Sequence, residues 1–367
     1  MVTHAQRSRG TMTGTATGRR RSTTKAARAR ATLSDVAREA GVSLATASRA
    51  LNGTSGRAVG DGLRERVQAA ADRLDYSPDA NAQAMARGRT ASIGLVVHDI
   101  ADPYFSSIAA GVTAAADAGG YAVTLANTQH DHVRELHFVQ TLQSQRARAI
   151  ILAGGRQDDD EANDRLRAAL RGYREQGGTV AVIGQAILGV STVRVDNVGG
   201  SAALATALHG LGYRRFGVMA GPQRHLTARE RTTGFVDALA RLGVDVPPAA
   251  VVHSEFTRTG GNTALAELLL RAPDVELVFA VNDVMAVGAM SAARDAGIVV
   301  PGGLAFAGFD DIATLHDVNP ALTTVHLPLE EMGRLATPLA LDAAAEPREV
   351  VVTGEVRLRD STPARSA

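Results

Sequence analysis

The chain of 367 residues is too long for one small domain, and its 45% hydrophobic residues are enough for two or three cores. Cysteine is absent, which excludes disulfides and thiolate metal sites, and no apolar run is long enough to cross a membrane. The net charge is +1, yet residues 1–31 contain eight basic residues and no acidic one. A basic end on an acidic body is typical of a protein that directs one end at a polyanion.

Residues 1–31 lack apolar periodicity and are rich in Thr, Arg, Gly and Ala, so we predict a disordered basic tail. Such a tail can add non-specific affinity for nucleic acid, or it can be dispensable or follow a misplaced start codon. No apolar segment follows it in the manner of a secretory signal, so we expect a cytoplasmic protein.

Residues 32–52, TLSDVAREAGVSLATASRALN, contain two short helical patterns around a tight turn. Gly41 stands where a helix end favours a left-handed residue, and Ser43 is placed to cap a second helix over about 44–51. The inward positions are Leu33, Val36, Ala37 and Ala40 in the first helix and Ala47 and Leu51 in the second. This is the layout of a helix-turn-helix, whose second helix enters the major groove of DNA.

The outward face of the second helix presents Thr46, Ser48 and Arg49. Short hydroxyls allow close approach to phosphate, and an arginine can pair with guanine. Helix pairs joined by a glycine turn also occur in proteins that never touch DNA, and that alternative stays open here. A third helix over about 61–74, with Leu63, Val67, Ala70 and Leu74 inward, would complete a three-helix core.

From residue 92 onward, strands alternate with helices. Strands are predicted at 93–97, 122–125, 149–153, 180–183, 215–220, 277–280 and 304–307. Helices are predicted at 104–118, 133–143, 162–176, 231–242, 261–270 and 283–296. Two successive sets of this kind predict two α/β lobes with doubly wound parallel sheets. Ligands of such sheets bind beyond the carboxyl ends of the strands, so two facing lobes form a cleft.

Polar and aromatic residues at strand ends and helix starts are the candidates for that cleft. They are His98, Asp102, Tyr104, Phe105, Arg231, Phe256, Asn282 and Asp310. Charged and amide groups suit the hydroxyls of a sugar, aromatic rings can stack on its face, and the same set would also fit a nucleoside. The alternatives are helix caps or an interlobe salt bridge for Arg231, Asn282 and Asp310, and core packing for the phenylalanines.

His130, Asp131, His132 and His137 have metal-ligating side chains, but they fall in a strand-to-helix loop without fixed ligand spacing. We interpret them as a solvated loop and predict no metal site. The chain has no dinucleotide-binding, phosphate-loop or nucleophile-elbow signature, so we expect neither a cofactor nor an enzyme.

Several spaced motifs resemble the lactose-repressor (LacI/GalR) family of bacterial transcription regulators, over nearly all of residues 32–362. In the first 60 residues they are TLxDVA from Thr32, AGVS from Ala40 and TxSRxLNG from Thr46. Further on they include DIADPYF from Asp99, VDNxGG from Val195, NDxMAxG from Asn282 and GFDD from Gly308. Ala47 departs from the valine that is frequent in the family.

The resemblance implies a small all-α helix-turn-helix headpiece followed by a periplasmic-binding-protein-like effector domain of two lobes. The expected bounds are 1–31 for the tail, 32–77 for the headpiece, 78–90 for a hinge helix or linker, 91–186 with 328–348 for the N-lobe, 187–327 with 349–362 for the C-lobe, and 363–367 for the end. The chain would cross between lobes near Gln185, Leu327 and Glu349. The family's headpiece usually begins near its own N-terminus, which favours a dispensable tail here.

The resemblance also implies a homodimeric repressor that binds a near-palindromic operator, in this family often with a central CpG step, and that responds to a sugar. The expected DNA contacts are Thr32, Leu33, Ser43, Leu44, Ala45, Thr46, Ser48, Arg49, Asn52, Asn81 and Met85. Leu44 and Ala45 would face thymine methyl groups, Arg49 a guanine or a phosphate, and Met85 would wedge into the minor groove where the family has leucine. By composition alone, residues 78–90 are a linker.

Three rival functions remain at this point. One is a transport-type sugar-binding protein, which shares the two-lobed body but needs an export signal and no headpiece. The second is a regulator that uses a nucleoside or purine as corepressor, and the third is an enzyme on the same scaffold. No leucine heptad occurs near the C-terminus, so we expect a dimer and not a tetramer.

Overall fold

The computed structural model describes residues 31–52, 59–77, 88–343 and 346–365, and it divides into two units, residues 1–79 and 80–367. Predictions that fall on the remaining residues, among them the basic tail, Asn81, Met85 and most of the hinge, lie outside the described residues. Within the described parts, no helix is both long and apolar enough to span a membrane.

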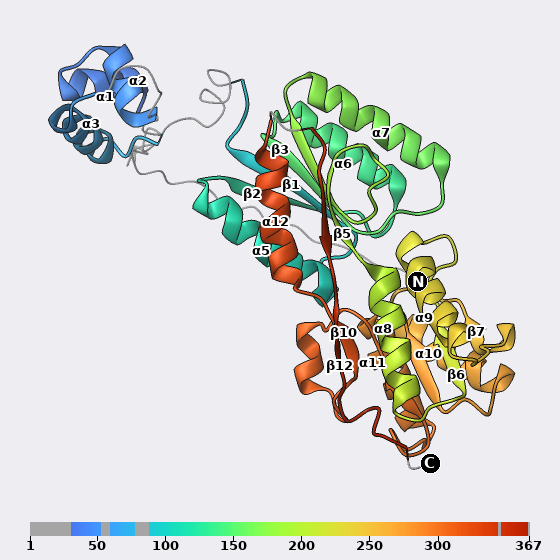
Figure 1. The fold of residues 1–367 in the computed structure, drawn as a ribbon. Coiled ribbons are helices and arrows are strands. Elements are labelled where there is room, and N and C mark those ends of the chain that lie inside the picture. Colours follow the sequence, from blue (N-terminus) through green and yellow to red (C-terminus); the bar gives the residue numbers. More distant parts are fainter. Residues whose placement is uncertain (1–30, 53–58, 78–87, 344–345, 366–367) are drawn as a thin grey trace, which may run out of the picture. The chain divides into compact units, whose positions relative to one another are not determined.

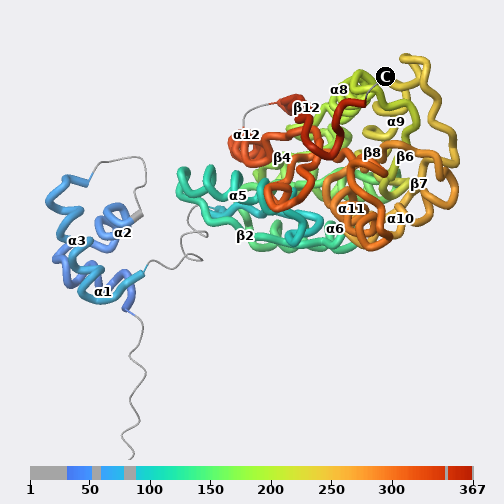
Figure 2. Tube along the Cα trace, turned by 90° about the horizontal axis from the view of Figure 1, so that it is seen from below, coloured from blue at the N-terminus to red at the C-terminus, as the bar shows by residue number. Residues whose placement is uncertain are grey.

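The first unit is a bundle of three short helices, α1 (Leu33–Ala40), α2 (Leu44–Asn52) and α3 (Asp61–Arg73) (Figure 2). Val36, Ala47 and Val67, one from each helix, are fully buried against one another. The turn between α1 and α2 is as predicted: Gly41 has φ 65°, and the Ser43 hydroxyl accepts the amide of Thr46 at 3.1 Å. The helix-turn-helix geometry therefore follows from local signals in the sequence.

The predicted inner stripe of α3 is wrong at its first position. Leu63 is 36% exposed, whereas Val67, Ala70 and Ala71 are buried and Leu74 packs beside them. The observed spacing of 67, 70, 71 and 74 is a regular helical stripe, and Leu63 lies a turn ahead of it.

The N-lobe of the second unit is built on a parallel six-stranded sheet with the order β11-β5-β4-β3-β1-β2. Its strands are β1 (Ser92–Val97), β2 (Ala122–Asn127), β3 (Ala149–Ala153), β4 (Thr179–Ile183), β5 (Ser191–Val195) and β11 (Glu349–Val352). Its helices are α5 (Pro103–Ala118), α6 (His132–Ser144), α7 (Asp160–Glu175) and α12 (Leu329–Leu341).

The two faces of this sheet are covered by different helices (Figure 1). Ile93 and Leu95 of β1 pack in the same cluster as Ile108 of α5 and Met332 of α12. Val96, which points to the other face, packs in the cluster of α6 and α7. Burial on both faces explains why these strands are continuous hydrophobic runs.

The C-lobe is built on a parallel four-stranded sheet with the order β7-β6-β8-β9. Its strands are β6 (Phe216–Met219), β7 (Val251–Val252), β8 (Leu277–Ala280) and β9 (Ala305–Ala307), and its helices are α8 (Asn197–Gly210), α9 (Leu226–Arg241), α10 (Arg258–Arg271) and α11 (Asp283–Asp295). Two 3₁₀ turns occur at Pro248–Ala250 and Ala313–Asp317. An antiparallel pair, β10 (Thr324–His326) with β12 (Glu355–Arg357), completes the unit.

Several expected boundaries are corrected by the structure. Helices α8 and α12 and strands β5, β7 and β10 were not predicted from the sequence, and α9 begins five residues before its predicted start at Arg231. Strands β5 and β11, which fell within the expected C-lobe bounds, hydrogen-bond to the N-lobe sheet. Strand β5 is short, and one of its two partners, β11, lies more than 150 residues away in sequence, so this pairing is set by tertiary contacts. The other lobe bounds remain predictions.

Candidate effector site and DNA-binding face

All eight predicted cleft residues line one cavity of about 50 Å³ between the lobes. The cavity is lined by His98, Asp102, Tyr104, Phe105, His130 and Gly155 from the N-lobe and by His225, Thr227, Arg231, Phe256, Asn282 and Asp310 from the C-lobe. Pockets for small ligands usually have about 300 Å³ or more, so a sugar requires these walls to separate.

Helix starts position most of the polar side chains. Asp102 caps α5, where its carboxylate accepts the amide of Tyr104 at 2.9 Å, and Asn282 caps α11, where its Oδ1 accepts the amide of Met285 at 3.0 Å. Capping uses one oxygen of each side chain. The second carboxylate oxygen of Asp102 and the amide nitrogen of Asn282 are the parts left for a ligand.

Arg231 and Asp310 form the buried charged pair of the C-lobe wall. The Arg231 Nη2 lies 2.8 Å from the Asp310 carboxylate, and both side chains are more than nine-tenths buried. Arg231 also donates to Asn197 Oδ1 at 2.9 Å and to the carbonyl of Val281 at 2.7 Å, and its guanidinium lies 3.9 Å from the centre of the Phe309 ring. It lies in the second turn of α9 and not at the helix start, so its position depends on packing across the lobe.

Backbone strain and burial distinguish Asp310 from an ordinary surface aspartate. Its φ of 118° is in the region that side chains rarely adopt, which is frequent at functional sites. Burial raises the pKa of Asp310 to about 6, although Arg231 opposes that shift. Burial likewise raises the pKa of Asp102 to about 7, with the negative charge of Asp310 adding to the effect. Both carboxyls can therefore change charge near neutral pH.

Aromatic rings close the cavity from both lobes. Phe105 is buried in the N-lobe core and meets the Tyr104 ring edge-on at 5.0 Å, so it serves packing and lining together. Phe256 is half-buried and meets the His225 ring at 4.8 Å. Gly155 allows the lobes to approach, because a Cβ there would lie 2.3 Å from the hydroxyl of Thr227.

Sequence reasoning missed four lining residues: His130, Gly155, His225 and Thr227. His130 lies in an exposed turn, as predicted, but its side chain also lines the cavity, which the solvated-loop interpretation did not foresee, while Asp131 caps α6. His225 follows the carboxyl end of β6, so the rule that ligands bind beyond strand ends could have indicated it. Because α9 was predicted to begin only at Arg231, His225 was not recognised as the residue that precedes the helix.

A chain of buried polar contacts connects the two lobes behind the cavity. Glu135 binds Arg156 through two contacts of 2.7 Å, and the Arg156 amide donates to Gln185 Oε1 at 2.7 Å. The amide nitrogen of Gln185 donates to Glu230 on α9 at 3.1 Å, and Glu230 also accepts from Asn197, the partner of Arg231. A change at Arg231 is therefore connected by hydrogen bonds to the N-lobe.

In the headpiece, the predicted contact residues surround the start of α2. Leu44 is 51% exposed, Ala45 and Arg49 are exposed, and the hydroxyls of Ser43 and Thr46 lie 2.8 Å apart. Arg49 donates to the carbonyl of Ala45 at 3.1 Å and would have to exchange this contact for DNA. Ser48 is partly buried.

The remaining predicted DNA-contact residues either stabilise the headpiece or have side chains outside the described residues. Thr32 caps α1 in a reciprocal box with Asp35, and Leu33 packs against the headpiece core. Asn52 ends α2, but its side chain lies outside the described residues, as do Asn81 and Met85.

Comparisons with known proteins agree with this geometry. Residues 32–79 match the model described as "Bacterial regulatory proteins, lacI family", and residues 90–359 match "Periplasmic binding proteins and sugar binding domain of LacI family". The transcriptional regulator GalS of Salmonella typhimurium is 34% identical over 88% of this chain and 92% of its own length.

Two solved structures have the same organisation. A complex of the transcriptional regulator CelR with cellobiose is 31% identical, with TM-score 0.66, and covers 90% of this chain and 100% of that one. The Lac repressor dimer bound to operator and the anti-inducer ONPF is 25% identical, with TM-score 0.79, and covers 91% and 99%. The chain belongs to the LacI family of bacterial regulatory proteins and is a helix-turn-helix transcription regulator.

Proposed function

We propose that this protein is a non-enzymatic repressor in the cytoplasm whose affinity for operator DNA is switched by a sugar bound between the lobes. The observation that carries the proposal is the convergence of Asp102, Arg231, Asn282 and Asp310 with aromatic rings on one interlobe cavity. Carboxylates, an amide and a guanidinium match the donors and acceptors of a polyol, and rings match its apolar face. The cellobiose bound by CelR supports a sugar over other ligands.

The proposed switch in DNA affinity follows from the fact that the polar residues of the cavity belong to different lobes. A ligand that contacts Asp102 of the N-lobe and Asp310 of the C-lobe has a different affinity for the open and the closed cleft. Only such a difference can shift the balance between two conformations. Hydrogen bonds through Glu230 and Gln185 connect the two lobes, so a ligand that displaces one lobe also acts on the other.

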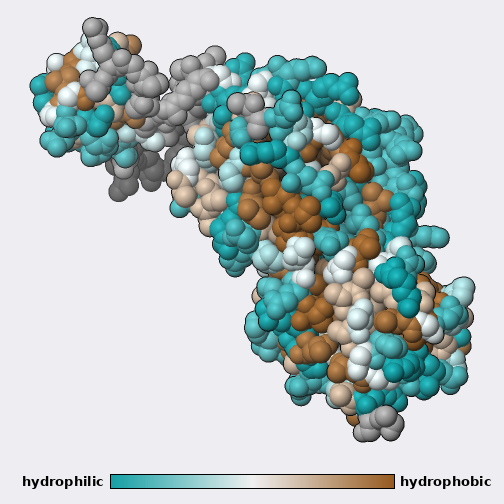
Figure 3. All heavy atoms as spheres, in the orientation of Figure 1, coloured by the Kyte–Doolittle hydropathy of each residue, from teal (hydrophilic) through white to brown (hydrophobic). Residues whose placement is uncertain are grey.

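A second copy of the chain is the partner that two-fold operators require, and the Lac repressor relative is a dimer. Hydrophobic side chains gather at the surface of the N-lobe over α12 and the strands beside it (Figure 3). Leu125 and Val351, on β2 and β11 at the two opposite edges of the N-lobe sheet, are 44% and 48% exposed. We propose the N-lobe as part of the dimer contact, with a near-palindromic operator that contains a CpG step.

The DNA-binding half is tested by selecting a binding site from a random DNA pool and measuring affinities by fluorescence anisotropy. Arg49→Ala should weaken binding about 5- to 150-fold, because a bidentate contact with guanine contributes about 1–3 kcal/mol. Arg64→Ala, which removes an exposed arginine of α3, is the matched control and should change affinity less than threefold. Equal affinities for wild type and Arg49→Ala would refute the assignment of α2.

The effector half is tested by adding mono- and disaccharides to the same assay. At least one sugar should change the DNA affinity fivefold or more, and Asp310→Asn should abolish its effect while leaving DNA binding in place. If no sugar acts but a nucleoside does, the ligand class is wrong and the regulator stands.

A further inference from the structure

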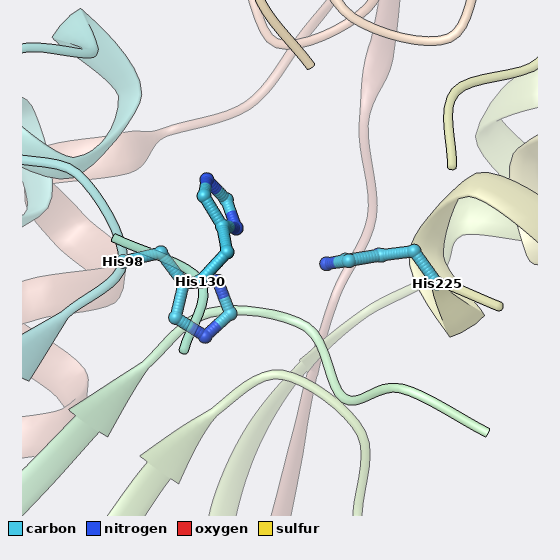
Figure 4. A group of neighbouring side chains, drawn as sticks. All are labelled: His98, His130 and His225. Carbon is cyan, nitrogen blue, oxygen red and sulfur yellow. The ribbon is translucent and has the colours of Figure 1, made fainter. Parts of the chain in front are cut away.

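Three histidines from distant parts of the chain converge in the cleft. His98 follows β1, His130 lies between β2 and α6, and His225 directly precedes α9. Each offers a ring nitrogen, and these three nitrogens lie within 4.8 Å of one another. Figure 4 shows His225 reaching from the C-lobe helix toward the two N-lobe rings. We propose that these histidines bind one divalent transition-metal ion of the zinc type, which bridges the two lobes.

Backbone contacts fix His225 in this position. Residues 157 and 225 form an antiparallel bridge across the cleft. The amide of Leu226 donates to the carbonyl of Arg156 at 2.8 Å, and the amide of Asp158 donates to the carbonyl of Arg224 at 2.7 Å. The convergence of the rings is thus built into the contact between lobes and is not a matter of one side-chain torsion.

Two of the rings have buried nitrogen atoms without a hydrogen-bond partner. The Nδ1 atoms of His98 and His225 are both of this kind, and the residues are only 7% and 4% exposed. Burial lowers the pKa of His98 well below its usual range and that of His225 to about 3, so both rings are neutral at pH 7. A neutral imidazole is the form that binds a metal, and a bound ion would supply the missing partner.

The donor set selects the class of ion. Three imidazoles suit Zn²⁺, Co²⁺, Ni²⁺ or Cu²⁺, whereas Mg²⁺ and Ca²⁺ prefer oxygen. With bonds of about 2.0–2.1 Å, a tetrahedral ion holds its nitrogens about 3.3 Å apart, so the rings must approach by up to about 1.5 Å. His130 is the most exposed ring and has the most room to move. Three protein ligands leave a fourth position for water or an effector oxygen.

Nearby charges set the strength of the site. Arg156 Nη2 lies 3.4 Å from His98 Nε2, but Glu135 pairs with this guanidinium through both carboxylate oxygens. Because a guanidinium only donates, Nε2 of His98 faces it as an acceptor and the ring proton is on Nδ1. Binding of a metal through Nδ1 would move this proton to Nε2 and break the contact with Arg156. Burial lowers the pKa of His130, while the negative charges of Asp99 and Glu255 oppose that shift and favour a cation.

The experiment uses the full chain without a histidine tag, freed of metal with a chelator. Titration with Co²⁺ should give the visible absorption of a four-coordinate ion and saturate at one ion per protomer, and Zn²⁺ should displace it. His225→Gln and His130→Gln should each weaken binding at least about tenfold, because even the loss of a residue that only orients a ligand typically costs that much. His137→Gln, an exposed histidine of α6, is the matched control and should leave the affinity unchanged.

The stoichiometry and the variants decide the proposal. Absence of saturable binding, or equal affinity in all three variants, would overturn it. Because the His130 ring is the least buried of the three, His130→Gln should disturb the fold least, and its circular dichroism spectrum should match that of the wild type. The proposal does not depend on sugar control of DNA binding. A sugar response without metal binding would assign the histidines to hydroxyl groups, and metal binding without a sugar response would refute only the proposed effector.

Discussion

Replacing Arg231 by methionine should destabilise the effector domain in a way that grows with pH. The side chain is buried and donates to Asn197 Oδ1 and to the carbonyl of Val281, and it pairs with the buried carboxylate of Asp310. Methionine keeps much of the apolar volume but removes every donor. The two acceptors that lose their partner cost about 2 kcal/mol together, independently of pH.

The pH-dependent part comes from Asp310. Its folded pKa of about 6 is raised above the usual value of 3.8, so in the wild type the free energy of unfolding falls as pH rises from 3.8 to about 6 and then levels off. Without Arg231 the folded pKa rises further, and stability keeps falling above pH 6 by about 1.4 kcal/mol per pH unit. An adjacent arginine typically lowers the pKa of a carboxyl by about 1–3, so its removal adds about 3 kcal/mol at pH 8, for a total near 5 kcal/mol.

Urea unfolding followed by circular dichroism at pH 5.5 and pH 8 measures both parts. The loss in Arg231→Met should be about 2 kcal/mol at pH 5.5 and about 5 kcal/mol at pH 8. The control is Asp310→Asn with and without Arg231→Met, where the pH dependence of the difference should become much smaller, because only the minor effect of Arg231 on the pKa of Asp102 remains. If Arg231→Met loses the same free energy of unfolding at both pH values, burial of the charged Asp310 carboxylate is not what destabilises the variant, and the reasoning is refuted.

Three further variants test the cleft and the headpiece. Gly155→Ala places a Cβ 2.3 Å from the Thr227 hydroxyl and should weaken binding of any cleft ligand, measured by calorimetry, whereas Gly172→Ala, which meets no atom within 4 Å, should not. Asp102 has a pKa raised to about 7, so its charged form, a stronger acceptor, should tighten sugar binding up to about fivefold from pH 6 to pH 8, and Asp102→Asn should flatten the profile. The same raised pKa makes Asp102 lower the free energy of unfolding as pH rises from 3.8 to about 7. Thr32→Ala removes the capping box of α1 and should cost about 1 kcal/mol, seen as faster amide exchange in α1, while Thr32→Ser should retain protection.

The parts of the fold that were predicted correctly are those fixed by near neighbours in sequence. Gly41 and Ser43 placed the headpiece turn, and strands such as β3 and β8 were recognised because both faces are hydrophobic. Helix α8 was missed because its glycines and alanines give little amphipathic contrast. Its packing against α9 supplies the burial that the pattern does not show.

The candidate site divides in the same way. Sequence alone determined that polar and aromatic residues such as Asp102, Asn282 and Asp310 stand at strand ends, because parallel sheets present those ends to ligands. Only the tertiary structure decided that Arg231 pairs with Asp310 and that His225 meets His98, which are 79 and 127 residues apart. Periodicity and caps act over a few residues, whereas the Arg231–Asp310 pair depends on packing within the C-lobe and the approach of His225 to His98 depends on how the two lobes close against each other.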